Sequence, residues 1–301
     1  MKEQNFLKII ESKIGSGYIG DDCAYIKELG IVVSQDSLVE NIHFKREWYT
    51  PSELGYKSVA VNISDILASG AKPAFATISL SLPHDTDEKF VQSFYDGVQK
   101  GLYGARIIGG DLTGSESEIF ISITAIGIDT DRKISSRKNA KTGYAIITKG
   151  NYGSSSAGLR ELINGGKNHE LIKAHKTPVL EEQFSKQISE NIKEDYAMMD
   201  TSDGLADALF KIAESSGVKI VTDYSKIPHS AEVSREDVLF GGEDYKLVAS
   251  VPKDFVSKID GAVIIGEVCE FDGTVLQIDN DRFSDYDELN VYNHFKNKTN
   301  N

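Results

Sequence analysis

Five short acidic motifs, each with glycine or serine beside aspartate, lie between residues 20 and 203 of this 301-residue chain. They are Gly20-Asp21-Asp22, Ser34-Gln35-Asp36, Ser64-Asp65, Gly109-Gly110-Asp111 and Asp200-Thr201-Ser202-Asp203. Two carboxylates about 4 Å apart, at an effective dielectric of about 20, repel each other by on the order of 4 kcal/mol. A fold that brings these motifs together therefore needs cations among them. Taken singly, each motif is also compatible with an ordinary turn or helix cap.

The ligands in these motifs are oxygen atoms, which favour hard cations such as Mg2+. Glycines beside the carboxylates let backbone N–H groups approach an anion. Together these features predict a site for Mg2+ and a nucleotide phosphate. The chain has no GxxxxGK[ST] motif, so the site is not a P-loop. The stretch from Gly15 to Gly20 matches the dinucleotide pattern GxGxxG, but it follows a predicted helix instead of a strand, and we interpret it as a turn.

Composition limits the class of protein. The formal net charge of −13 argues against a nucleic-acid partner, because phosphate backbones attract basic surfaces. It does not exclude an anionic substrate, since bound cations can reverse the local field. No run reaches the roughly 18 apolar residues of a membrane span. The two cysteines, Cys23 and Cys269, form no disulfide framework or zinc pattern, so we expect a cytoplasmic protein.

Hydrophobic periodicity predicts alternating helices and strands, and hence an α/β or α+β fold. Helices are expected over 5–14, 51–70, 87–103, from 154, and over 202–217. Strands are expected at 31–34, 76–82, 119–128, 145–148, 218–222, 247–251 and 263–265. A short polar stretch over 129–136 predicts a division into residues 1–136 and 137–301, two halves that pack closely.

Asp65 lies inside an otherwise apolar helix, where aspartate has poor propensity and is costly if buried without a partner. A metal ion would account for it, and an exposed helix face is the alternative. Ser202 is the expected N-cap of its helix, with Asp203 in the first turn, but capping does not explain Asp200. Asp36 is compatible with a cap at the end of a strand.

The ordered set of motifs resembles the thiamine-monophosphate kinase family, within the aminoimidazole-ribonucleotide-synthetase-like superfamily. The resemblance covers almost the whole chain. The matching stretches are 19–24, 36–44, 60–71, 108–111, Arg137, 199–205, 241–245 and the terminal Tyr292-Asn293-His294-Phe295. No single motif is specific, whereas the ordered set is.

The resemblance implies ATP-dependent phosphorylation of thiamine monophosphate to thiamine diphosphate, with Mg2+ as the cofactor. It implies a PurM-like fold, in which an N-terminal α/β domain joins its sheet to that of a partner in a homodimer. A C-terminal α+β domain follows.

The resemblance also implies the roles of particular residues. The metal ligands by position are Asp22, Ser34, Gln35, Asp36, Asp65, Asp111, Asp200 and Asp203. ATP would be contacted by Tyr95, Gly110, Asp111, Arg137 and Ser202. Thiamine monophosphate would be held by His43, Glu243 and Tyr292. Asp22, Asp65, Asp111 and Arg137 would carry the catalysis.

The chain departs from the family pattern at four positions, none of which is a principal carboxylate. Gln35 stands where the family usually has Thr, Asn41 where it has Gly, Leu112 where it has Thr, and Tyr144 where it has Asp. Because Gln35 replaces the usual Thr, one metal contact expected from the family pattern is in question.

The mechanism that follows is electrostatic. The acceptor is itself a phosphate, whose oxygen is an adequate nucleophile at neutral pH, so no general base is required. Mg2+ ions would neutralise two polyanions and align an in-line transfer, and Arg137 would clamp the ATP phosphates.

Two alternatives remain open from the sequence. One is another ATP-dependent enzyme of the same superfamily, such as the selenophosphate or hydrogenase-maturation branches. The other is a non-catalytic nucleotide- or cation-binding homologue that keeps the fold.

Overall fold

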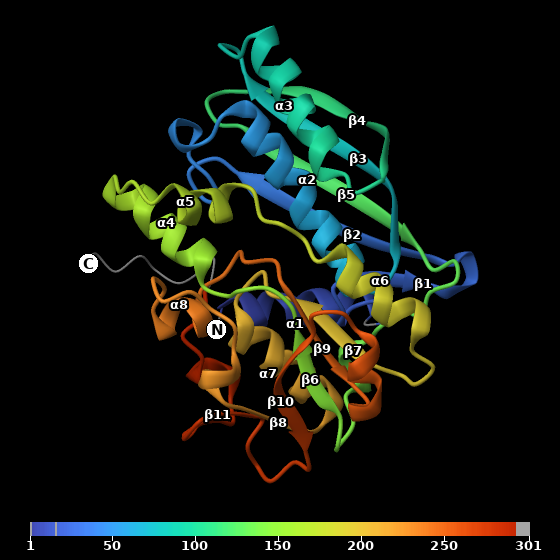
Figure 1. Cartoon of the computed structure of the whole chain (residues 1–301). Coiled ribbons are helices and arrows are strands. Elements are labelled where there is room, and N and C mark those ends of the chain that lie inside the picture. Colours follow the sequence, from blue (N-terminus) through green and yellow to red (C-terminus); the bar gives the residue numbers. More distant parts are fainter. Residues whose placement is uncertain (1, 16, 293–301) are drawn as a thin grey trace.

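The computed structural model describes residues 2–15 and 17–292, which form two β-sheets with helices packed on them (Figure 1). Asn293, His294 and Phe295 of the terminal motif lie outside the described residues, as does Ser16 of the glycine-rich turn. No helix in the described part of the chain is long and apolar enough to cross a membrane.

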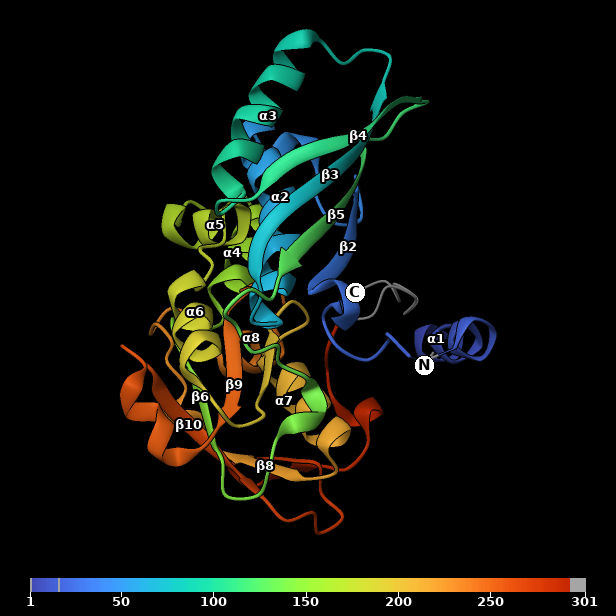
Figure 2. The same ribbon diagram turned by 90° about the vertical axis from the view of Figure 1, so that its right-hand side faces the viewer.

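The first sheet has the strand order β1-β2-β5-β3-β4. Its strands are β1 (Ala24–Ile26), β2 (Ile31–Val39), β3 (Lys72–Pro83), β4 (Arg106–Ser115) and β5 (Phe120–Ile128). β3 and β4 pair in parallel and the other neighbours are antiparallel. The helices α2 (Pro51–Ala68) and α3 (Glu88–Gly101) cover one face of this sheet, as Figure 2 shows.

Helix α2 is the central element of this half. It begins with the predicted capping box of Thr50 and Glu53, with proline at the first helical position. It packs so closely on α3 that glycine is required at the crossing. A Cβ at Gly55 would lie 2.0 Å from the Phe94 carbonyl oxygen, and one at Gly97 would lie 1.9 Å from that of Ser52.

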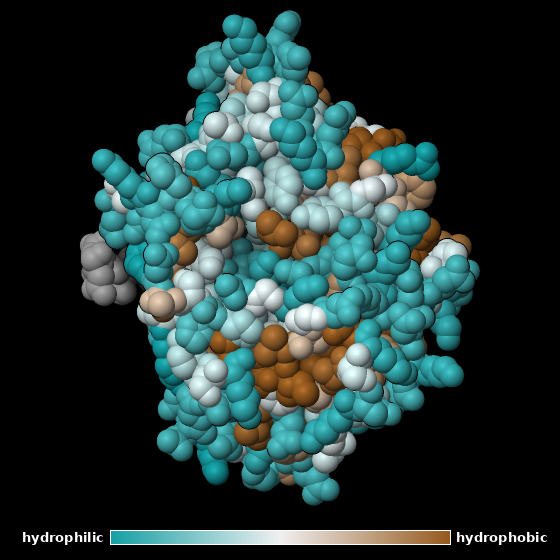
Figure 3. Space-filling view, in the orientation of Figure 1, coloured by the Kyte–Doolittle hydropathy of each residue, from teal (hydrophilic) through white to brown (hydrophobic). Residues whose placement is uncertain are grey.

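Within residues 2–15 and 17–292, no helix packs on the opposite face of the first sheet (Figure 2). Along β5, buried and partly exposed residues alternate, so one face packs on α2 while the other stays accessible. On the edge strand β4, Ile108 and Leu112 are 58% and 67% exposed. Figure 3 shows apolar surface near β4 and β5 and a second apolar patch over the other sheet, amid largely polar surroundings.

The second sheet has the order β12-β11-β8-β10-β6-β9-β7. Its strands are β6 (Ala145–Thr148), β7 (Ala197–Asp200), β8 (Lys219–Thr222), β9 (Leu247–Val251), β10 (Val263–Cys269), β11 (Leu276–Ile278) and β12 (Asp281–Phe283). The helices of this half are α4 (Ser154–Asn164), α5 (His169–Lys176), α6 (Glu182–Asn191), α7 (Leu205–Ser216) and α8 (Arg235–Phe240). The remaining helix, α1 (Lys2–Ile14), projects from the body beside the lower sheet (Figure 2).

The mixed α/β and α+β fold is confirmed, and the predicted helices and strands are found with shifted ends. The N-cap prediction at Ser202 is wrong. Gly204, with φ 113° and ψ 162°, precedes the first helical residue, Leu205, and no side chain caps it. The Ser202 carbonyl instead accepts a 2.7 Å hydrogen bond from the Glu243 N–H, so a contact distant in sequence replaces the local cap.

Asp36 is also not at a strand end. β2 continues to Val39, because its pairing with β5 runs without interruption from Ile31 to Val39. The short or polar strands β1, β4, β7, β11 and β12 and the helices α5, α6 and α8 were not predicted. The division at residue 136 falls between the last strand of the first sheet and the first strand of the second, and it stays a prediction.

Candidate active site

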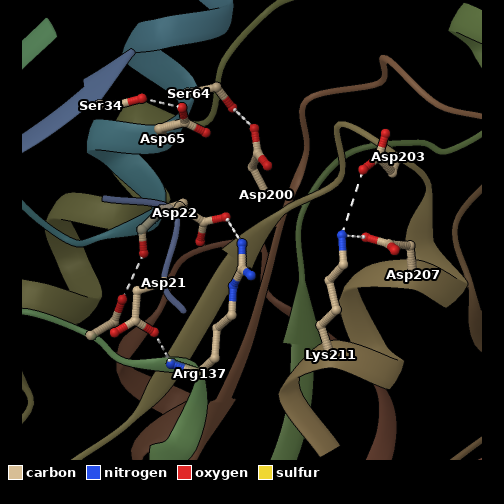
Figure 4. A network of polar contacts seen from close by, with 12 residues as sticks. Asp21, Asp22, Ser34, Ser64, Asp65, Arg137, Asp200, Asp203, Asp207 and Lys211 are labelled. Carbon is tan, nitrogen blue, oxygen red and sulfur yellow. Dashed lines mark hydrogen bonds and ion pairs between the residues drawn. The ribbon is translucent and has the colours of Figure 1, made fainter. Parts of the chain in front are cut away.

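Three carboxylates from distant parts of the chain meet at one point between the two sheets. Asp22 precedes β1, Asp65 lies in α2, and Asp200 ends β7. Each offers an oxygen atom, and these atoms lie within 4.8 Å of one another (Figure 4). For these three residues, the predicted convergence is confirmed, and the exposed-face alternative for Asp65 is wrong.

Each carboxylate is held by a neighbour. Ser64 donates a 2.5 Å hydrogen bond to Asp200, and Ser34 of β2 donates one to Asp65. Asp22 accepts a 2.6 Å hydrogen bond from Arg137. The cluster is therefore held in place by residues of α2, of β2 in the first sheet and of β7 in the second sheet, and by Arg137.

The electrostatics of the cluster favour a cation. Burial raises the pKa of Asp65 well above its ordinary value, and the nearby charges of Asp36 and Asp200 raise it further. Burial likewise raises the pKa of Asp22, and that of Asp200 to about 8. Asp200 Oδ1 is buried and has no hydrogen-bond partner among the described residues. A divalent cation would supply that partner and relieve the repulsion, so the residues present fit Mg2+.

Asp36 and Asp203 extend the acidic region. Burial and then the charge of Asp203 raise the pKa of Asp36. Its backbone N–H is fixed by a 2.9 Å hydrogen bond to the buried Asn62 side chain. Asp203 lies toward α7, where the ammonium group of Lys211 is 3.5 Å away (Figure 4).

A cavity of about 780 Å3 opens beside the cluster. It is lined by acidic side chains, by the residues predicted to bind the substrate, and by others that the sequence analysis did not identify. It includes Asp36, Asp65, Asp203, Ser202, His43, Trp48, Glu243 and Tyr292. His43 Nδ1 accepts a 2.9 Å hydrogen bond from the Val39 N–H, which orients the ring and leaves the proton of the neutral form on Nε2. The residues predicted to bind the substrate thus line the same cavity.

A second cavity, of about 800 Å3, lies between α1 and α7. Arg137, Lys211 and Tyr292 are part of its lining. The Nε atom of Arg137 is buried and lacks a hydrogen-bond partner in the described part of the chain. An anionic ligand here would satisfy that donor.

Four residues that were predicted to bind metal or ATP lie away from the cluster within one chain. Gly110 and Asp111 lie on β4 in register with Ile78 and Ser79 of β3, with Asp111 exposed. The side chain of Gln35 is exposed and donates to Ser122 of β5, whereas its neighbour Ser34 is buried and reaches Asp65. Tyr95 lies on α3 against Phe94 and lines neither cavity.

Sequence reasoning missed a group of side chains behind the first cavity. They are the buried Lys57 and Tyr49, together with His175 and Trp48, which line the cavity. The signal for Lys57 was the same as for Asp65: a charged residue within the apolar run of α2.

The family comparisons agree with this fold. Residues 20–128 match the model described as AIR synthase related protein, N-terminal domain. A solved structure described as AaThiL complexed with AMPPCP and TMP is 31% identical, with a TM-score of 0.88 over 98% of each chain. The fold is thus that of the AIR synthase-related class.

Curated relatives narrow the class. The chain is 34% identical to a thiamine-monophosphate kinase of Aquifex aeolicus, with 90% of this chain and 92% of the relative aligned. It is also 34% identical to the Bacillus subtilis enzyme of that name, over 92% of this chain and 93% of the relative. This chain belongs to the thiamine-monophosphate kinase family.

Proposed function

We propose that this protein transfers the terminal phosphoryl group of ATP to thiamine monophosphate, giving thiamine diphosphate and ADP. Family membership supplies the reaction. The observation in this chain that carries the proposal is the meeting of Asp22, Asp65 and Asp200, with oxygen atoms within 4.8 Å of one another. A protein that had lost the chemistry would have no reason to keep three buried, mutually repelling carboxylates.

Mg2+, when bound, would supply neutralisation of the two polyanions and a template for in-line transfer. The residues that would hold it are Asp22, Asp65 and Asp200, with Asp36 and Asp203 at the edge of the cluster and Ser34 supporting Asp65. No side chain needs to remove a proton, because the acceptor phosphate is already ionised near neutral pH. Gln35 could contribute only from its backbone, since its side chain is bonded to β5.

Arg137 is the residue proposed to hold the ATP phosphates. Its guanidinium is fixed by Asp22, and its Nε donor has no protein partner within the described residues. A guanidinium in this position can serve the carboxylate and a phosphate at the same time. Ser202, between Asp200 and Asp203, would add a hydroxyl to the same region.

The thiamine moiety is proposed to occupy the cavity lined by His43, Glu243 and Tyr292. Tyr292 offers a ring face to a cationic thiazolium, and Glu243 offers a carboxylate. The phosphate would then point toward the acidic cluster and its cations.

We further propose a homodimer formed through the uncovered face of the first sheet. Gly110, Asp111 and the exposed Leu112 all lie on its edge strand β4. Pairing two such faces would bury this apolar surface and bring Asp111 of one protomer toward the ATP site of its partner. The dimer would thereby explain why Asp111 lies away from the cluster within one chain. It would leave Tyr95 without an assigned place in the ATP site. Because the co-substrate is ATP, the reaction is assigned to the cytoplasm.

A coupled ADP-release assay tests the function. Thiamine monophosphate with Mg2+ and ATP should release ADP, whereas thiamine, which lacks the acceptor phosphate, should not. ADP release with other phosphorylated acceptors alone would favour a different branch of the superfamily. ATP binding without ADP release on any acceptor would favour a non-catalytic homologue.

A further inference from the structure

A lysine ammonium group is buried behind the substrate cavity. Lys57 of α2 is 0% exposed, and its Nζ lies 3.0 Å from the Tyr49 hydroxyl and 3.2 Å from Glu243 Oε2. Fully buried lysines are rare, because removing an ammonium from water is costly unless it is paired. The pairing observed here joins a helix of the first half of the chain to a loop of the second.

Glu243 is the member of this group that reaches the cavity. It lines the cavity wall, and its backbone has a φ of 65°, in the left-handed region that non-glycine residues rarely adopt. Its N–H is held by the Ser202 carbonyl at 2.7 Å. The strained conformation is thus fixed from two sides, by the backbone contact to Ser202 and by the side-chain contact to Lys57.

Both close side-chain contacts of this carboxylate fall on the same oxygen. Lys57 Nζ is 3.2 Å and His175 Nδ1 is 3.4 Å from Oε2. No described residue makes a hydrogen bond or ion pair to Oε1. The other carboxylate oxygen therefore remains for a ligand in the cavity.

We propose that Lys57 is a positioning residue for substrate recognition, which holds Glu243 so that Oε1 receives the positively charged, hydrogen-donating heterocycle of the substrate. The inference rests on the proposed function for the identity of that substrate. It assigns to Lys57 a role in binding the heterocycle and none in binding ATP, because neither cavity is lined by Lys57 and its contacts end at Glu243 and Tyr49.

The charges around Glu243 support this role. Burial raises the pKa of Glu243, but the nearby Lys57 ammonium is the largest opposing influence, and the pKa is lowered from its ordinary value. Tyr49 and Tyr245 are the other titratable groups that Glu243 influences, and both are buried phenols with raised pKa values. Burial lowers the pKa of His175 to about 3, so this ring is neutral at physiological pH, and Lys57 is the cation that keeps Glu243 ionised.

The test is a double-mutant cycle read by calorimetric binding, which needs no turnover. The variants are Lys57→Met, Glu243→Gln and the two combined, with Lys226→Met as the control at an exposed lysine of the second half. Lys57→Met should weaken the Kd for thiamine monophosphate, and equally that for thiamine, by about 10-fold or more, because a charge-assisted contact is lost. The Kd for ATP should change less than about 2-fold, and the double variant should bind about as weakly as Glu243→Gln alone.

A pH series adds a readout that a purely structural role would not move. Without Lys57, burial should raise the Glu243 pKa, so the Kd of Lys57→Met for thiamine should worsen as the pH falls from 8 to 6. The quantity compared at each pH is the ratio of the variant Kd to the wild-type Kd. Tyr49→Phe, which removes one partner of the ammonium and lines neither cavity, should show the same trend more weakly if Lys57→Met does not fold.

Three outcomes overturn the inference: unchanged thiamine binding in Lys57→Met, equal weakening for ATP and thiamine, or additive effects in the double variant. If the wild type binds thiamine monophosphate but releases no ADP, the proposed function is wrong. The double-mutant cycle still tests the role of Lys57 in that case, because it measures binding and not turnover. If the wild type does not bind thiamine monophosphate at all, both fail.

Discussion

The guanidinium of Arg137 donates a 2.6 Å hydrogen bond to Asp22, a residue 115 positions earlier in the chain. The adjacent Asp21 accepts a 2.7 Å hydrogen bond from the Arg137 backbone N–H. Two consecutive aspartates are therefore fixed by one residue, through its side chain and its main chain. This double attachment places Asp22 in the cluster and leaves Arg137 Nε with no hydrogen-bond partner among the described residues.

Replacing Asp65 by Asn should separate catalysis from folding. Turnover should fall by about two orders of magnitude or more, because a metal ligand at the centre of the cluster is lost. In EDTA the variant should have a higher Tm than the wild type, since one of three repelling buried carboxylates is removed. ADP release and thermal unfolding with and without Mg2+ measure the two effects. Near-normal turnover at saturating ATP and Mg2+ would contradict the multi-metal account, and exposed Asp254→Asn is the matched control.

Arg137→Lys should raise the KM for ATP by about 10- to 100-fold, with a much smaller effect on the KM for thiamine monophosphate. A lysine keeps the charge but offers a single point of contact, so it cannot serve Asp22 and a phosphate together. Steady-state kinetics with each substrate varied in turn provide the comparison. An unchanged KM for ATP would remove Arg137 from the nucleotide site.

Tyr292→Ala should raise the KM for thiamine monophosphate far more than that for ATP, because the ring face that contacts the cationic heterocycle is lost. Tyr292 is 57% exposed and lines both cavities, including the one proposed to hold the thiamine moiety. Phe271→Ala, at an aromatic residue that is 56% exposed and lines neither cavity, is the control. Equal increases for both substrates would indicate that Tyr292 serves packing instead.

His175 should make the protein less stable in mild acid. Its folded-state pKa of about 3 lies below the ordinary value of 6.5, mainly because the ring is buried. Between these values the unfolded chain binds a proton that the folded chain does not. Its contribution is therefore fully present above pH 6.5 and is lost as the pH falls, at about 1.4 kcal/mol per pH unit. Urea unfolding of the wild type and His175→Gln at several pH values should show their stability difference narrowing from pH 7 to pH 5; a constant difference would contradict this.

Leu112→Asp should convert the proposed dimer to a monomer and abolish ADP release, because it places a charge on the apolar edge strand of the uncovered face. Sedimentation equilibrium measures the change in mass. Complementation is a sharper test of the shared site. Mixed Asp65→Asn and Asp111→Asn chains should regain at most about a quarter of wild-type activity, since only the heterodimer contains one intact site. No recovery, with heterodimers present, would place Asp111 in the site of its own chain, whereas an active Asp111→Asn variant on its own would place Asp111 outside the site.

Helix α2 illustrates how much could be predicted locally. Its start follows from Thr50, Pro51 and Glu53, and its burial follows from an apolar sequence. Asp65 stood out as a charge in that apolar run, and so should have Lys57. What the helix sequence could not show is which partner each charge meets, because Ser34, Asp200 and Glu243 arrive from other elements.

Neighbouring residues of β2 show a second limit. Ser34 and Gln35 lie on opposite faces of the sheet, so one bonds to Asp65 and the other to Ser122. Alternation along a strand is predictable, but the face that meets α2 is set by the pairing of β2 with β5. The prediction of a cap at Ser202 failed for a related reason, since its carbonyl binds Glu243, 41 residues away (243 − 202).

By itself, the sequence determined the long amphipathic and apolar helices, the more apolar strands, the acidic character of the site and the family to which the chain belongs. These features depend on interactions between residues that are close in the sequence and on the order of the motifs along the chain. Only the tertiary structure decided that Asp22, Asp65 and Asp200 share one point, that Asp111 does not join them within a chain, and that Lys57 lies behind Glu243. The reason is that these contacts join segments far apart in the chain, and their geometry follows from how the two sheets and α2 pack together.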